Sequence, residues 1–462
     1  MSTQTLRLPV HSYKLRSPSA SSARLLNCYA ERLPEDAKTP IIISRAPGID
    51  RFATVGNGNI RGKHAAFGYD WIVSGNSLYR LDELGTSTLI GTVGAGAVDM
   101  DHNTDTVVVV TAPDAYYYNK DTAVFGQITD ADFTALGATD VEFLNNFLLF
   151  CNSDVFFGAD LGSATSFDAL NFASAEASPD SIVGMKTDHA QAVIAGENTM
   201  EIWDNTPIPG FPFQRSVNGF VELGCFAGKT LQKLDNSVIW LASDYTIRRL
   251  QGNTPVRIST HAVEQFLTTT TVSSGTAFTY TQDGHLFYVL SFLEGTWAYD
   301  ATTNEWHERK SYGLDYWRWK YQSTAFGKEL VGDANSNVIG SITPLVYDED
   351  GDTQVASWEY QPVYAQGQRA FHDRLEVVME TGVGLTSGQG SDPEMMMDYS
   401  DDGGLTWKSL PNKKIGAIGK YQARVIWNSL GSSRMRVYRG SVSDPVKFCV
   451  TDTLLTVRGG RL

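Results

Sequence analysis

The chain has 462 residues, of which 42% are hydrophobic, 19% are charged and 11% are aromatic. This is the composition of a folded protein with room for two or three domains, and it excludes a chain that is disordered throughout. The 37 basic residues are outnumbered by 52 acidic ones, which gives a formal net charge of −15. Such a surface argues against a conventional DNA-binding domain, although DNA could slide along an acidic channel without sticking to it.

The N-terminal sequence MSTQTLRLPVHSYKLRSPSA lacks the apolar core of a signal peptide. No segment reaches the roughly 20 apolar residues that a membrane span requires. We therefore expect a protein that is made in a cytoplasm and has no membrane partner. The four cysteines are scattered and none belongs to a CxxC pair, so we expect buried free thiols rather than disulfides or a zinc site: Cys28, Cys151, Cys225 and Cys449.

Residues 1–48 are mostly polar and irregular and end in Arg45-Ala46-Pro47-Gly48. We expect this segment to be an extended N-terminal arm that lies on another part of the assembly instead of forming a domain of its own.

From about residue 64 the chain repeats a unit of four short strands separated by polar or glycine-containing turns. The first unit reads HAAFG, YDWIVSG, NSLYRLD and TSTLIGTV, and the second reads AVDMD, TVVVVTA, AYYYNKD and VFGQI. Successive units begin 32 to 48 residues apart, near Ala65, Ala97, Val141, Ile182, Thr230, Phe278 and Thr324. Four strands in about 40 to 50 residues are typical of a β-propeller blade.

The repeat predicts an all-β fold in which residues 49–345 form a β-propeller of seven blades, with six blades as the alternative. The seventh unit has only three clear strands, so we expect a strand such as 49–55 to complete the last blade and remove an open sheet edge. A β-sandwich whose strands are evenly spaced by chance is the competing interpretation of the same pattern.

After the propeller, residues 346–356 contain the acidic, turn-rich sequence VYDEDGDTQV and are predicted to be a linker. Residues 357–462 show strands of alternating polar and apolar residues, such as RLEVVMET and RMRVYRG. This alternation predicts a C-terminal antiparallel β-sandwich.

The sharpest local motif is an Asp-box, S-x-D-x-G-x-T-W, which occurs once and lies outside the predicted propeller. In this motif the aspartate carboxylate accepts backbone hydrogen bonds across a hairpin turn, and the tryptophan packs beneath it. Sialidases carry several copies together with an arginine cluster, so a single copy favours a structural role. The residues concerned are Ser400, Asp402, Gly404, Thr406 and Trp407.

No catalytic, cofactor-binding or metal-binding residues are predicted. The segment 227–230, AGKT, resembles part of a phosphate-binding loop but lacks the required upstream glycine. Asp348, Asp350 and Asp352 have the spacing of a calcium loop, but Thr353 stands where that loop needs glycine, which favours a solvated turn. The eight histidines form neither an HExxH nor an HxH pattern.

Three segments resemble the packaged-DNA-stabilisation, or tail hub, family of short-tailed phages (podoviruses). The first is RLLNCYAERLPEDAKTPIIISRAPGID at 24–50; the others are 178–206 and RAFHDRLEVVMETGVG at 369–384. In the first segment the resemblance is carried by Asn27, Tyr29, Ala30, Glu31, Lys38, Pro40, Pro47 and Gly48.

The resemblance implies a structural virion protein, made in the cytoplasm of a bacterial host and without enzymatic activity. It would form a homo-hexameric ring below the portal and its head-to-tail adaptor proteins. There the ring would act as a head-completion plug that retains packaged DNA and docks the tail needle and tailspikes. DNA would pass through without sequence-specific binding, and no cofactor is implied. The contact residues are not predicted.

Two other functions fit the same sequence. One is a carbohydrate-active, sialidase-like propeller, which would need two carboxyl groups about 5 to 10 Å apart in a cleft. The other is a receptor-binding tail protein, which would differ from a hub in its position in the particle.

Overall fold

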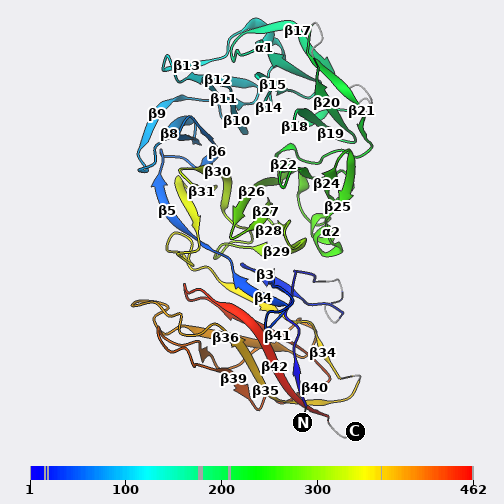
Figure 1. Cartoon of the computed structure of the whole chain (residues 1–462), viewed down its shortest axis with the longest axis vertical. Helices are drawn as coiled ribbons and strands as arrows, with labels where there is room; N and C mark the ends of the chain where they lie inside the picture. The colour runs from blue at the N-terminus through cyan, green and yellow to red at the C-terminus, as the bar shows by residue number, and fades with distance from the viewer. Residues whose placement is uncertain are drawn as a thin grey trace.

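The computed structural model describes residues 2–14, 17, 20–174, 180–206, 210–365 and 367–459. It is an all-β molecule with a round propeller at one end and a β-sandwich at the other (Figure 1). Both described ends of the chain lie at the far end of the sandwich (Figure 1). The predicted fold class, a propeller followed by a C-terminal sandwich, is confirmed.

The propeller is built from antiparallel meanders of four strands, and six of these are sheets of their own. Five follow the chain in order: β6–β9 (Ile60–Ala66, Tyr69–Ser74, Ser77–Leu81, Ser87–Thr92), β10–β13 (Val98–His102, Thr106–Thr111, Asp114–Asn119, Val124–Gln127), β14–β17 (Asp140–Leu144, Phe147–Cys151, Val155–Ala159, Phe167–Ser174), β18–β21 (Ile182–Asp188, Gln191–Gly196, Met200–Asn205, Phe213–Val221) and β22–β25 (Gln232–Lys233, Val238–Leu241, Ile247–Gln251, Thr254–Arg257). The first strands of the meanders surround the centre of the propeller (Figure 1).

Tight two-residue turns join many of these strands. Asn145 and Asn146 have φ values of 48° and 71° between β14 and β15, and Asp283 and Gly284 have values of 48° and 81° between β26 (Thr276–Gln282) and β27 (His285–Ser291). Paired positive φ angles at Asn, Asp and Gly match the twist of the flanking strands in a hairpin. These turns explain why the strand repeat was readable from the sequence.

The sixth sheet closes the propeller with a strand from before the first unit. It combines β30 (Trp319–Ala325), β31 (Lys328–Asp333) and β32 (Val338–Thr343) with β5 (Gly48–Thr54), which pairs antiparallel with β32. Ile49 of β5 is fully buried and packs with Trp319 and Ile342, and the missing side chain of Gly340 leaves room for it. The predicted closure by a strand near residues 49–55 is confirmed.

The remaining meander, β26–β29, belongs to an eleven-stranded sheet that reaches into the sandwich. Its later strands are β28 (Thr296–Asp300) and β29 (Glu305–Arg309). Strand β2 (Arg24–Leu26) pairs parallel with β29 on one side and antiparallel with β33 (Ala356–Glu359) on the other. The propeller therefore has seven four-stranded units, six as separate sheets and one continuous with the sandwich.

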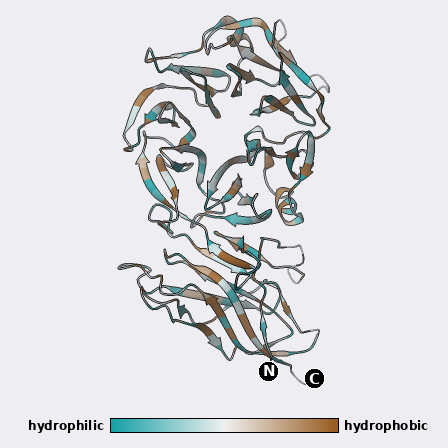
Figure 2. Cartoon of the chain, in the orientation of Figure 1, coloured by the Kyte–Doolittle hydropathy of each residue, from teal (hydrophilic) through white to brown (hydrophobic). Residues whose placement is uncertain are grey.

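The sandwich has two antiparallel layers that enclose one apolar core, with Trp358, Leu375 and Met397 fully buried. Apolar and polar residues alternate along many of its strands (Figure 2). One layer holds β35 (Ala370–Met379), β39 (Val425–Asn428), β40 (Ser432–Ser433) and β42 (Cys449–Gly459); the other continues from β33 into β41 (Met435–Val442), β36 (Glu394–Ser400) and β37 (Lys408–Ser409), with β34 (Val363–Tyr364) and β38 (Lys413–Lys414) at its margins.

The N-terminal segment is not a separate arm in its described part, which corrects the expectation for residues 1–48. Strand β1 (Ser2–Thr5) pairs with β42, β2 joins the two domains, and the hairpin of β3 (Cys28–Arg32) and β4 (Ile41–Arg45) adds to the layer of β42. Leu25, Cys28 and Ile43 are fully buried, and this burial holds the short strands in place. The sandwich thus extends beyond residues 357–462.

The predicted linker, residues 346–356, makes hydrogen bonds and ion pairs with the propeller. Glu349 is buried and accepts hydrogen bonds from Trp317 Nε1 at 2.8 Å and Ser311 Oγ at 2.6 Å. Asp350 pairs with Arg51 at 2.6 Å, and Asp352 pairs with Arg318 at 2.8 Å. Glu349, Asp350 and Asp352 are therefore bound by side chains of the propeller, and the segment is not a free linker.

Helices are few and short: α1 (Ala131–Leu136), α2 (His261–Leu267), and the single turns η1 (Gly228–Thr230) and η2 (Val272–Ser274). Among the described residues, no helix has the length and apolar character that crossing a membrane would require. All four cysteines are free; three are buried and Cys449 is partly buried.

Candidate functional site

The Asp-box forms a compact turn at the end of β36. Asp402 Oδ1 accepts the backbone N–H groups of Leu405 at 3.0 Å and Thr406 at 2.9 Å, and Asp402 Oδ2 accepts the Thr406 hydroxyl at 2.5 Å. Ser400 Oγ donates to Asp402 Oδ1 at 2.6 Å and accepts the N–H of Gly404 at 2.7 Å. Gly404 has φ = 94°, a conformation that favours glycine.

The chemistry of this turn is local. Hydrogen bonds from Ser400 and Thr406 hold the pKa of Asp402 well below its usual range, so the carboxylate stays ionised and fixed. Trp407 carries the guanidinium of Arg439 over its ring at 4.1 Å, and Arg439 also pairs with Asp398 at 2.8 Å. Every polar atom of the Asp402 carboxylate is engaged inside the hairpin, which leaves it a folding role.

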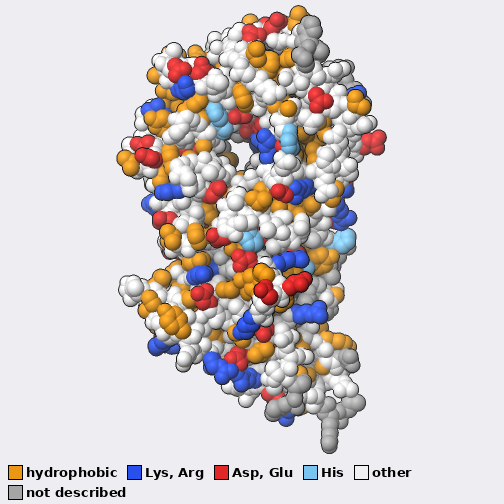
Figure 3. All heavy atoms as spheres, in the orientation of Figure 1, with side chains coloured by type: hydrophobic (Ala, Val, Ile, Leu, Met, Phe, Trp, Pro, Cys, Tyr) orange, Lys and Arg blue, Asp and Glu red, His pale blue; other side chains and the backbone are white. Residues whose placement is uncertain are grey.

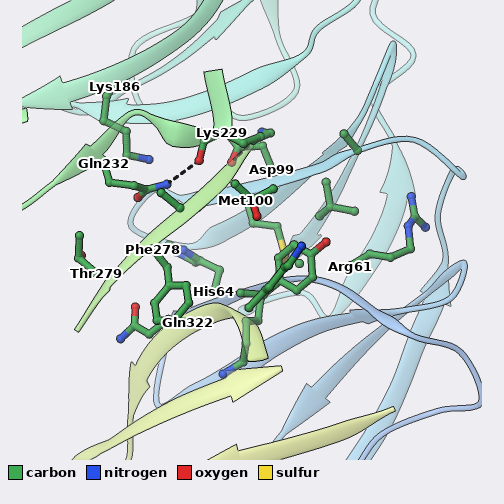
Figure 4. A pocket seen from close by; sticks show the side chains of 18 of the residues that line it. Arg61, His64, Asp99, Met100, Lys186, Lys229, Gln232, Phe278, Thr279 and Gln322 are labelled. Carbon is green, nitrogen blue, oxygen red and sulfur yellow. Dashed lines mark hydrogen bonds and ion pairs between the residues drawn. The ribbon is translucent and has the colours of Figure 1, made fainter. Parts of the chain in front are cut away.

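A different set of side chains gathers in the centre of the propeller. A hollow of about 380 Å³ is lined by residues from the first strands of several blades, among them His64, Asp99, Lys186 and Phe278. Figure 3 shows an opening there with basic, acidic and histidine side chains at its rim, and Figure 4 shows side chains that line the hollow. A neighbouring hollow of about 570 Å³ is lined by His64, His102, Glu142 and other residues.

Carboxylates in this centre connect three successive blades. Asp99 Oδ2 and Asp101 Oδ2, both on β10, accept the backbone N–H groups of Val141 at 3.0 Å and Phe143 at 2.7 Å on β14. Glu142 of β14 in turn accepts the N–H of Thr187 on β18 at 3.1 Å. Charged acceptors form stronger hydrogen bonds than neutral ones, so these contacts hold the first strands of three blades in register.

Two lysines compensate part of this negative charge. Lys186 pairs with Glu142, while Lys229 lies 2.6 Å from Asp140 Oδ1 and 3.3 Å from Asp99 Oδ1. Burial raises the pKa of Asp140 and of Glu142, and the charge of the partner lysine opposes that rise. Lys229 comes from the AGKT segment, so the residue that resembled a phosphate-loop lysine is in an ion pair.

Two histidines meet in the same place. His64 Nε2 on β6 lies 2.8 Å from His102 Nδ1 on β10, and the two nitrogens lie 3.6 Å and 3.5 Å from Asp101 Oδ1. Within the described residues, this is the group of His, Cys, Asp and Glu side chains whose ligand atoms are close enough to hold a metal ion. No local histidine motif in the sequence indicates this cluster, so none of its residues is predicted to bind a metal.

The sequence signal for this cluster lies in the repeat. His64 begins the HAAFG strand of the first unit, and Asp101 ends the AVDMD strand of the second. Since the first strands of adjacent blades are neighbours around the centre, the repeat predicts that these two strands lie side by side, but it does not pair His64 with Asp101.

Both the propeller and the sandwich match models of known protein families. The family model described as Bacteriophage P22 Gp10, beta-propeller, matches residues 35–347, and that described as Bacteriophage P22 Gp10, beta-sandwich, matches residues 359–458. The chain belongs to the P22 Gp10 family. A P22 Gp10 protein is a structural protein of the phage tail hub, so this chain is a virion component.

More distant likenesses concern the fold alone. PorZ, a surface component of the type-IX secretion system of Porphyromonas gingivalis, shares 12% identity over 78% of this chain, with a TM-score of 0.40, and this chain covers 46% of PorZ. The extracellular domain of the one-component system BT4673 from B. thetaiotaomicron is 10% identical in sequence to this chain. The match covers 86% of this chain and 58% of that domain's chain, with a TM-score of 0.44. BBS1N, solved in complex with ARL6DN, is 9% identical in sequence to this chain. The match covers 65% of this chain and 97% of BBS1N, with a TM-score of 0.41. No curated protein sequence matches the chain.

Proposed function

We propose that this P22 Gp10 family protein is the head-completion plug of a short-tailed phage. In this proposal a homo-hexameric ring sits below the portal and its adaptor proteins, retains packaged DNA, and docks the tail needle and tailspikes. The observation that carries the proposal is the match of both domains, in order, to the two Gp10 models.

The connection between the two domains suits a protein that transmits mechanical force. The eleven-stranded sheet runs from the propeller unit β26–β29 through β2 into the sandwich, so both domains share backbone hydrogen bonds. Arg24 of β2 adds an ion pair to Glu308 of β29 at 2.6 Å. A shared sheet resists hinge motion better than a flexible linker does, which supports a role in transmitting force along a tail.

Contact surfaces are available on the outer strands of the blades. Several large apolar side chains there are more than one third exposed, as expected for sites that protein partners cover: Leu89, Val124, Leu170, Phe172, Val217 and Phe220. These strands are the last of their meanders and face away from the propeller centre.

The negative net charge of the chain supports retention of DNA without tight binding to it. A net charge of −15 repels the DNA backbone, so a closed ring could obstruct DNA without gripping its phosphates. Isolated subunits would stay monomeric because association costs several kcal/mol of lost freedom. A preformed adaptor ring would supply the alignment and make assembly ordered.

Cryo-electron microscopy of the intact tail tests the proposal. We expect six copies of the propeller and sandwich in a ring directly below the adaptor, with needle and spikes in contact with it. Copies found instead at the tips of peripheral fibres or spikes would contradict the hub and favour a receptor-binding protein.

The carbohydrate-active alternative has its own test. Asp140 and Asp99 both contact Lys229, so the propeller centre does hold neighbouring carboxylates. They are engaged by lysine and backbone donors, and we therefore expect the purified protein to hydrolyse neither sialosides nor nucleotides. Turnover that disappears in Asp140→Asn would overturn the structural role.

A further inference from the structure

The cluster of His64, Asp101 and His102 joins the first strands of two neighbouring blades. His64 lies on β6, and Asp101 with His102 ends β10. Their side chains are 19% to 35% exposed and border the hollow of about 570 Å³, so solvent reaches them.

The spacing of the three ligand atoms matches a small metal ion. Their separations are 2.8, 3.5 and 3.6 Å. Tetrahedral ligands at the bond lengths of Zn²⁺ are about 3.3 Å apart. A shift of the imidazoles by about half an ångström would therefore place all three atoms around one ion. Solvent from the hollow can supply the fourth ligand.

Hydrogen bonds hold the Asp101 carboxylate in an orientation in which it can coordinate a metal ion. Its Oδ2 accepts the N–H of Phe143 at 2.7 Å, and its Oδ1 accepts the N–H of His102 at 2.8 Å. Phe67 packs edge-on against His102 with ring centres 5.2 Å apart. Partners of this kind orient ligands and are as important for affinity as the ligands themselves.

The surrounding charge favours a divalent cation. Asp99, Asp101, Asp140 and Glu142 contribute four carboxylates, and Lys186, Lys229 and Lys233 contribute three ammonium groups. Ionised together, these groups leave one negative charge.

We propose that His64, Asp101 and His102 bind one divalent transition-metal ion, best suited to Zn²⁺, between the first two blades of the propeller. Binding releases to solvent the N–H proton of the hydrogen bond between His64 and His102, and the ion cross-links β6 to β10. Since a ligand that binds only the folded state stabilises it, zinc also raises the resistance of the propeller to unfolding.

Titration of the full-length, untagged protein with ZnCl₂ by calorimetry, after treatment with EDTA, tests the site. We expect one equivalent to bind and the melting temperature to rise. His64→Ala should weaken binding by more than about tenfold and abolish the thermal shift. The matched controls are His189→Ala and His261→Ala, which replace exposed histidines beside Asp188 and Glu264 and should leave both readouts unchanged.

Two further measurements test the zinc site if His64→Ala misfolds. Asp101→Asn retains an acceptor for Phe143 and should weaken zinc binding while the protein stays folded by circular dichroism. X-ray absorption of the zinc-loaded wild type should show two imidazole nitrogens with oxygen ligands. No zinc binding by the wild type, a sulfur ligand, or an equal loss in the control variants would overturn the site.

Discussion

Arg24 and Glu308 connect the two domains across the parallel pair of β2 and β29. Arg24 Nη2 lies 2.6 Å from Glu308 Oε2, and Arg24 Nε lies 3.0 Å from both carboxylate oxygens. Two residues along the chain, Leu26 pairs with Glu308 in the backbone register. The sandwich is thus attached to the propeller by side chains and main chain together.

Arg24→Ala should loosen this junction. Both side chains are partly exposed, at 30% and 19%, so we expect a loss of about 1–2 kcal/mol in unfolding free energy, below that of a fully buried pair. Arg32→Ala is the control because Arg32 is 63% exposed in its pair with Glu305, and it should cost less than about 0.5 kcal/mol. Urea denaturation measures both. Equal losses would show that Arg24 has no special role in the junction.

Ile49→Ala should weaken the closure of the propeller. Ile49 lies in β5, is fully buried and pairs with Ile342 of β32. Truncation of such a side chain costs about 2–4 kcal/mol in unfolding free energy. Asp50→Ala, at the exposed neighbouring position, should stay within about 0.5 kcal/mol. Removal of residues 1–60 takes away β5 altogether and should cause aggregation; a soluble, fully folded truncation would contradict closure by a shared strand.

Stability should fall as the pH rises above neutrality because of His285. Burial would lower the pKa of His285, but Asp300 at 2.7 Å and Glu31 at 3.5 Å raise it to about 9. The contribution is complete below the unfolded value near 6.5 and is lost as the pH passes 9. After allowance for solvent screening we expect a loss of about 1–2 kcal/mol.

The variant His285→Gln should flatten this dependence between pH 6.5 and 9. His261→Gln, with a side chain that is 72% exposed, should leave the dependence as in the wild type. An unchanged slope in His285→Gln would assign the pH dependence to other groups.

Asp402→Asn should open the Asp-box hairpin locally. The lost carboxylate no longer fixes the amides of Leu405 and Thr406, so hydrogen exchange at these two positions should accelerate. In the wild type the protection of these amides, relative to their intrinsic exchange rate, should fall as the pH falls through the lowered pKa of Asp402, since the stabilising form is the ionised one. Asp392→Asn, which removes an exposed partner of Lys414, is the control and should leave exchange at both amides unchanged.

The blade pattern was predictable because it is local. Short apolar strands such as 106–111 and paired turns such as Asn145-Asn146 are each formed by a few consecutive residues, and the incomplete seventh unit implied a strand from elsewhere. Even the Asp-box could be read as a hairpin, since all its hydrogen bonds fall within seven residues.

The role of the N-terminal segment could not be read in the same way. Strand β2 has three residues, and its partners at Glu308 and Trp358 lie more than 280 residues away, so no local alternation reveals the pairing. The same reason hid the cluster of His64 and His102: neither residue has a ligand motif beside it, and only the arrangement of blades around the centre brings them together.

The central claim, a plug that retains DNA, is tested most directly by the DNA content of particles assembled without this chain. The mutant heads should package DNA and then lose it, as measured by nuclease-protected DNA per head, and adding the purified protein before loss should prevent it. Mutant heads that keep their DNA and still carry complete tails would contradict the account.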